Sequence, residues 1–250
     1  EYRRQRQMCI RDRSYIEDVE KYARNPTQAI HLRHVIRSSF STAGQRIRFE
    51  GFGQSAYRSR EMGECFRILE KVLLLNLLYP VTSATLPLLP DHKRHPRLQI
   101  LDTGLLNYFA GIQREIIGTN DLNEVYRGIM IEHLSGQELL STRYDALGAL
   151  HFFLKEKTTS SAEVDFIVPW EGKLIPVEIK SGTSGRLRSL HAYMDQTPHD
   201  LAVRFYNGKM EYAQATTPGG KQYRLLSLPY YLVTQLTPWL NWMSKKKATR

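Results

Sequence analysis

The segment AEVDFIVPWEGKLIPVEIKSG, residues 162–182, constrains the fold more than any other part of the chain. Two runs rich in β-branched and aromatic residues flank Glu171-Gly172, which is the pattern of a β-hairpin with a two-residue turn. Counting outward from this turn sets the register of the two strands. Pro169 and Pro176 remove ladder donors and could shift that register through a bulge.

Three ionisable side chains are expected to converge in this hairpin. The register places Asp165 directly opposite Glu178, with Cβ atoms about 5 Å apart. Because side chains alternate along a strand, Lys180 shares the face of Glu178. Like charges directly across a sheet are destabilising, so a divalent cation held between the two carboxylates explains this arrangement better. Lys180 would then lie beside a water or a phosphate.

A third carboxylate is expected from the helix before the sheet, in GIMIEHLSGQELL, residues 128–140. Its glutamates, Glu132 and Glu138, are six residues apart and therefore about 120° apart around the helix, so only one can face the site. Gly128, Ser135 and Gly136 lie one turn from Glu132 and are small, which would let that face approach the sheet closely. We therefore choose Glu132 and expect Glu138 to turn away.

The C-terminal sequence around the hairpin predicts an α/β fold. A helix is expected at residues 122–142 and another at 187–194. Strands are expected at residues 151–154, 163–168, 173–179, 201–206 and 223–227. Helix, three strands, helix and further strand give a small mixed sheet with flanking helices.

The N-terminal sequence predicts a small helical part. Helices are expected at residues 14–24, 27–40 and about 55–69, followed by a strand in the apolar run 72–81 and a proline-rich loop at 87–96. This is the outline of a winged-helix module, with Arg58 and Arg60 where a recognition helix would begin. A packing or subunit-contact role for that helix is an equal alternative.

Four motifs in order carry a resemblance to a known family: ILDTGLLNYFAG, GIMIEHLSGQELL, AEVDFIV and LIPVEIKSG. The order of Glu132, Asp165 and Glu178-x-Lys180 resembles the PD-(D/E)XK signature of restriction endonucleases and archaeal Holliday-junction resolvases. The four motifs together resemble the domain of unknown function that follows the ATPase module in many bacterial predicted AAA+ ATPases. Family members usually carry an aromatic residue followed by Arg in the preceding strand, whereas this chain has HFFLKEK with Lys155.

The resemblance implies a nuclease-like fold on a DNA-associated ATPase. Glu132, Asp165 and Glu178 would hold Mg²⁺ or Mn²⁺ for phosphodiester cleavage, with Lys180 acting on the attacking water or on the transition-state charge. No G-x-x-x-x-G-K-[ST] motif occurs in the chain, so ATP would bind only in a missing N-terminal module, which would also be the route to a homo-oligomer. The alternatives are a module that grips nucleic acid or protein without cutting, and a domain that only regulates the ATPase.

Composition narrows the partners and the compartment. A net charge of +10 favours a polyanion such as DNA, with contacts expected from Arg58, Arg60, Lys93, Arg94, Arg186 and Arg188. No apolar run approaches the ~18 residues of a membrane span, so no membrane partner is expected. Two cysteines fit a reducing cytoplasm. We expect an N-terminal segment outside the fold at 1–13, a helical domain at 14–110, a nuclease-like domain at 111–243 and a basic tail at 244–250.

Overall fold

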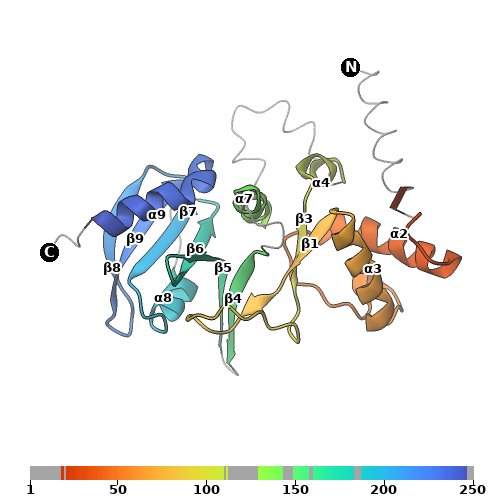
Figure 1. Cartoon of the computed structure of the whole chain (residues 1–250), viewed down its shortest axis with the longest axis horizontal. Helices are drawn as coiled ribbons and strands as arrows, with labels where there is room; N and C mark the ends of the chain where they lie inside the picture. Colours follow the sequence, from red (N-terminus) through yellow and green to blue (C-terminus); the bar gives the residue numbers. More distant parts are fainter. Residues whose placement is uncertain are drawn as a thin grey trace, which may run out of the picture. The chain divides into compact units, whose positions relative to one another are not determined.

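The computed structural model describes residues 18–19, 21–109, 111, 129–142, 149–157, 160–182 and 187–246. The chain divides into two compact units. The first comprises residues 1–77 and 96–120, and the second comprises 78–95 and 121–250 (Figure 1). Residues 78–95 belong to the second unit although they lie between the two parts of the first in the sequence, so neither unit is continuous.

The first unit is mainly helical. Helix α2 (Pro26–Ser41) begins after Asn25, whose side chain accepts the Gln28 N–H at 2.8 Å. It packs against α3 (Ser59–Lys71), and the rest of the unit contains η1 (Phe52–Gln54), β1 (Leu75–Leu78), β3 (Arg97–Ile100) and α4 (Thr103–Phe109). Of the expected first helix at 14–24, residues 14–17 and 20 lie outside the described residues, residues 18–19 are helical, and residues 21–24 are not helical.

The strands of this unit differ from the predicted single strand at residues 72–81. That apolar run divides at Pro80 into β1, which pairs with β3, and β2 (Pro80–Val81), which joins the sheet of the second unit. Proline cannot donate to a ladder, so a change of partner at this position is physically reasonable. The winged-helix assignment stays a prediction.

The second unit is a mixed seven-stranded sheet with helices, which confirms the mixed α/β class. Its further strands are β4 (His151–Lys157), β5 (Ser160–Trp170), β6 (Lys173–Lys180), β7 (Leu201–Tyr206), β8 (Glu211–Thr216) and β9 (Gln222–Pro229). The strand order is β2-β4-β5-β6-β7-β9-β8. Strands β4, β5 and β6 form an antiparallel meander, whereas β6, β7 and β9 run parallel to one another.

Helices of this unit pack against the sheet. Helix α7 (Ile129–Ser141) contacts β6 and η2 (Tyr230–Gln235), and α8 (Arg188–Met194) contacts β5 and β6. The buried face of α8 inserts Leu190, Tyr193 and Met194 into a core that also contains Phe153 and Leu174. The Tyr193 hydroxyl donates to the Leu174 carbonyl at 2.7 Å, which satisfies a buried polar group.

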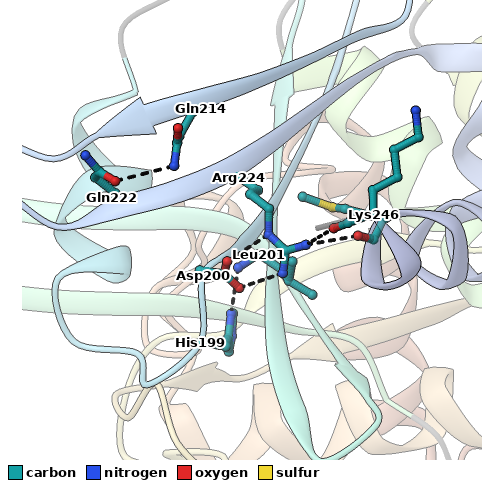
Figure 2. A network of polar contacts seen from close by, with 8 residues as sticks. His199, Asp200, Leu201, Gln214, Gln222, Arg224 and Lys246 are labelled. Carbon is teal, nitrogen blue, oxygen red and sulfur yellow. Dashed lines mark hydrogen bonds and ion pairs between the residues drawn. The ribbon is translucent and has the colours of Figure 1, made fainter. Parts of the chain in front are cut away.

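The C-terminal helix α9 (Leu236–Lys245) lies across strands β7 to β9, and a polar network fixes its end (Figures 1 and 2). The Arg224 guanidinium donates to both carboxylate oxygens of Asp200, at 2.7 and 2.9 Å. It also donates to the carbonyls of Met243 and Lys246, at 3.0 and 2.9 Å. Because the last carbonyls of a helix lack intrahelical partners, Arg224 caps α9 and ties it to β9.

Residues 78–95 complete one edge of this sheet. Strand β2 runs parallel to β4, and Val81 of β2 and Ala84 of the loop after it are buried in the core around α8. The Thr197 hydroxyl donates to the Ala84 carbonyl at 3.3 Å. Arg94 forms ion pairs with Asp91 and Glu156, so the segment is held by both apolar and charged contacts.

Candidate functional site

The β5–β6 hairpin has the turn and the register expected from the sequence. Glu171 and Gly172 have φ values of 43° and 72°, the left-handed values that a type I′ turn requires. Pairing runs without a shift from Trp170 opposite Lys173 to Phe166 opposite Val177. The two strand prolines therefore do not displace the register.

A bulge lies instead between β4 and β5. His151 is opposite Ile167 and Phe153 is opposite Val164, so two steps along β4 correspond to three along β5. The extra residue falls at Asp165–Phe166, where recorded pairing with β6 also stops. Bulges re-aim side chains at sheet irregularities, and this one places Asp165 at the point where β5 changes partner.

At this bulge the Asp165 side chain, in place of a backbone carbonyl, accepts a hydrogen bond from the backbone of β6. Its Oδ2 accepts the N–H of Ile179 at 2.6 Å, and Ile179 lies two residues beyond Val177 of the last ladder pair. A charge-assisted bond of this kind fixes the carboxylate against β6. The residue next to Ile179 is Glu178, so the two carboxylates predicted to face each other are held on adjoining strands.

Glu178 is a buried acid with one unsatisfied oxygen. Its side chain is only 5% exposed, and Lys180 Nζ donates to Oε1 at 2.5 Å. The other oxygen, Oε2, is buried and has no hydrogen-bond partner among the residues that the structure describes. Burial raises the pKa of Glu178 to about 8, and the charges of Asp165 and Glu132 add to the increase, whereas Lys180 opposes it.

The three acids of this cluster also act on Lys180. Burial lowers the pKa of the ammonium, but the charges of Glu178, Asp165 and Glu132 outweigh burial and raise the pKa above its ordinary value. Lys180 therefore remains charged and is half-buried against the carboxylates. The structure thus brings all four predicted residues into electrostatic contact, while their chemical roles stay predictions.

Helix α7 supplies Glu132 rather than Glu138 to this cluster. Glu132 is half-buried and contributes to the electrostatics of Glu178 and Lys180, whereas Glu138 is exposed and lines a separate pocket. His133, the residue after Glu132, is 2% exposed, as expected for a side chain that packs in the interior. Gly128, one of the small residues expected near Glu132, lies outside the described residues.

Lys155 does not replace the family's usual arginine in the cluster. Its Nζ donates to Gln196 Oε1 at 2.7 Å, at the end of α8. The only cation linked to the carboxylates by the described contacts is Lys180.

A metal ion at the cluster would rest on few protein ligands. Within the described ranges, no group of three or more His, Cys, Asp or Glu side chains is arranged to hold a metal. Mg²⁺ commonly keeps several waters and binds through one or two carboxylates plus substrate phosphate. Asp165 and Glu178 meet that smaller requirement, because they adjoin and Glu178 Oε2 has no other partner.

The residues predicted to contact DNA differ in their exposure and in their ion pairs. Arg58 and Arg188 are exposed at the starts of α3 and α8, and Lys93 is exposed in the loop after β2. Arg60 pairs with Glu64 at 3.4 Å but remains 89% exposed. Arg94 is committed to its ion pairs with Asp91 and Glu156, and Arg186 lies outside the described residues.

A pocket of about 690 Å³ lies in the second unit at the carboxyl ends of parallel strands. Strand β6 ends at Lys180, which pairs with Tyr206 at the end of β7, and Tyr206 pairs with Pro229 at the end of β9. The pocket is lined by α7, by residues 206–209, by residues 229–231 and by residues 233–234. The sequence analysis did not predict this pocket. Aromatic residues at the ends of parallel strands could have indicated it, since such edges commonly bind ligands.

None of the described helices is both long and apolar enough to cross a membrane. No curated protein and no solved structure matches the chain. Two family models match separate parts of it. Residues 3–115 match a domain of unknown function (DUF8612), and residues 127–231, which contain the whole carboxylate cluster, match a domain of unknown function (DUF4143) that is common in AAA-ATPase-associated proteins.

Proposed function

We propose that the second unit is a PD-(D/E)XK-type, metal-dependent DNA phosphodiesterase attached to an AAA+ ATPase. The observation that carries this proposal is Glu178, a buried acid with an unpartnered oxygen beside Asp165, Glu132 and Lys180. A cluster of three acids around a single lysine is electrostatically costly. Such cost is typical of sites that bind a cation or perform chemistry.

Asp165 and Glu178 would hold Mg²⁺ or Mn²⁺, with Glu132 acting through a water. The ion would lower the pKa of a bound water and polarise a phosphate. Asp165 is oriented for this task by the Ile179 N–H, which fixes one of its oxygens. Lys180, which stays protonated, would orient the attacking water or stabilise the charge that develops on the phosphate.

Two further observations support the proposal. The order α7, then the β4–β5–β6 meander, then α8, then β7 parallel to β6 agrees with the nuclease-like resemblance of the motifs. The DUF4143 match and its frequent association with AAA ATPases support the link to an ATPase. A net charge of +10 and exposed basic residues favour DNA as the substrate.

The test is cleavage of branched, single-stranded and duplex DNA with Mg²⁺ or Mn²⁺. Asp165→Asn should abolish cleavage yet keep the fold, because the amide oxygen can still accept the Ile179 N–H. Lys180→Ala should slow the chemical step and also weaken metal binding, because it removes the cation that opposes the increase in the pKa of Glu178. Glu171→Gln, in the exposed hairpin turn, is the matched control and should cut normally.

The rival function is a module that binds DNA without cutting it. It is favoured by one observation: Lys180 already occupies Glu178 Oε1, and the described residues offer no three-ligand metal group. If the wild-type protein binds DNA but cuts none of the substrates with either metal, this rival replaces the nuclease. If Asp165→Asn cuts as fast as the wild type, the assigned site is wrong.

A further inference from the structure

The pocket at the ends of β6, β7 and β9 is built to receive a flat ring. Three tyrosines line it, Tyr206, Tyr230 and Tyr231, together with apolar side chains of α7 and η2. Polar groups suited to the edge of a base, Ser135, Asn207 and Thr234, share the lining. Aromatic faces with a few hydrogen-bonding groups are the usual composition of a nucleobase site.

Two of the tyrosines are fixed in place before any ligand arrives. The Tyr206 hydroxyl donates to the Lys209 carbonyl at 2.6 Å, and the Arg204 guanidinium lies 4.5 Å from the centre of its ring. Gly208 packs so closely on this ring that an added Cβ would lie 2.4 Å from it. The Tyr230 hydroxyl donates to the Lys180 carbonyl. A pre-organised floor of this kind loses little entropy when it binds a ring.

Tyr231 differs from the other two because its side chain is 80% exposed. An exposed tyrosine at the rim of a pocket can close over a stacked base at low entropic cost. Lys209 is also exposed at this rim and carries a charge suited to the phosphate of the same nucleotide. The rim therefore adds stacking and phosphate attraction to the rigid floor.

The position of the pocket relates it to the carboxylate cluster. Lys180 and Tyr206 are paired neighbours on β6 and β7, and adjacent strands are about 5 Å apart. Lys180 holds Glu178 through its side chain and accepts from Tyr230 through its carbonyl. One residue therefore connects the two sites, so a phosphate at the cluster and a base in the pocket can belong to one strand.

We propose that this pocket holds one unpaired nucleobase of a single-stranded or frayed DNA strand, and that the protein acts on such DNA rather than on intact duplex. The inference rests on the proposed function for the identity of the ligand. A base in a duplex is stacked and paired, so it must leave the helix to enter the pocket, whereas an unpaired base enters without that cost.

The test is equilibrium binding of fluorescein-labelled DNA, measured in Ca²⁺ to suppress cleavage. Single-stranded, duplex and abasic single-stranded oligonucleotides are compared at one salt concentration. Tyr231→Ala should weaken single-strand binding roughly 5- to 150-fold, the loss expected for one stacked base, and leave duplex binding unchanged. Tyr231→Phe should restore it, because the ring keeps its stacking face. Tyr22→Ala, which removes another exposed tyrosine from the first unit, is the matched control.

The outcomes separate this inference from the nuclease proposal. Selective loss in Tyr231→Ala supports the pocket even if the wild type cuts no substrate. Equal binding of single-stranded and duplex DNA by the wild type overturns the inference, and so does an unchanged affinity in Tyr231→Ala, even if Mg²⁺-dependent cleavage is present.

Discussion

Replacing Glu178 with glutamine should stabilise the second unit, and the gain should grow with pH. Glutamine is a neutral isostere of the protonated acid, so the variant approximates the wild type in its low-pH form. Burial raises the pKa of Glu178 from 4.5 to about 8 in the folded protein. The folded state therefore binds this proton more tightly than the unfolded state does, and stability is lost as pH rises from the lower pKa to the higher.

The magnitude follows from the size of this shift. Each unit of pKa difference corresponds to about 1.4 kcal/mol, so the wild-type penalty rises from near zero below pH 4.5 to on the order of 4–5 kcal/mol by pH 8. Glu178→Gln should recover most of it. The Lys180 ammonium loses a charged partner in the variant, but its side chain is 26% exposed and can be hydrated.

Urea unfolding followed by tryptophan fluorescence is the appropriate assay. All three tryptophans, Trp170, Trp239 and Trp242, lie in the second unit, so the signal reports on the unit that contains Glu178. A variant that is less stable than the wild type at pH 8, or a stability difference that does not change with pH, would refute the reasoning.

A metal titration at pH 8 extends the same experiment. If Glu178 holds Mg²⁺, saturating metal should stabilise the wild type by about 2.7 kcal/mol at one hundred times the Kd, and should leave Glu178→Gln almost unchanged. Equal stabilisation of both proteins would place the metal elsewhere.

Two further predictions concern other parts of the molecule. His199 is buried and neutral, since its Nε2–H donates to the Leu174 carbonyl at 2.8 Å and its Nδ1 accepts the Leu201 N–H at 3.2 Å. Burial lowers its pKa, so its stabilising contribution is complete above the ordinary value of about 6.5 and is lost as pH falls below it. The stability difference between the wild type and His199→Gln should therefore shrink between pH 7 and 5, and parallel urea-midpoint profiles would reject this. For DNA, Lys93→Gln should reduce the slope of log affinity against log salt by about 1, whereas Arg94→Gln should leave the slope unchanged, because Arg94 is committed to Asp91 and Glu156. Equal slopes for the two variants would contradict the expectation that Lys93 contacts phosphate and Arg94 does not.

The hairpin that carries the site was predictable because its signals are local. Glu171-Gly172 adopts the expected turn, and the register that follows from it runs unbroken to Phe166 opposite Val177. The contact between Asp165 Oδ2 and the Ile179 N–H was not predictable. It depends on a bulge between β4 and β5, which the alternation of residues within β5 does not reveal.

Elements without a local signal were missed. Strand β8 (Glu211–Thr216) is a largely exposed edge strand with few apolar residues, so its sequence lacks the alternation that marks a half-buried strand. Helix α9 contains Pro238 and two tryptophans and was not recognised as a helix. The pairing of β2 with β4 joins residues more than seventy positions apart, and no pattern within either strand specifies it.

The placement of residues 78–95 in the second unit has a consequence for synthesis of the chain. Strand β2 leaves the ribosome before β4, the strand with which it pairs, has been made. At roughly 5–20 residues per second, the interval lasts several seconds. During that time Val81 and Ala84 have no core to enter, since every strand and helix of that core except their own segment comes later in the sequence. The nascent chain therefore leaves these two apolar side chains exposed until β4 and the rest of the core emerge.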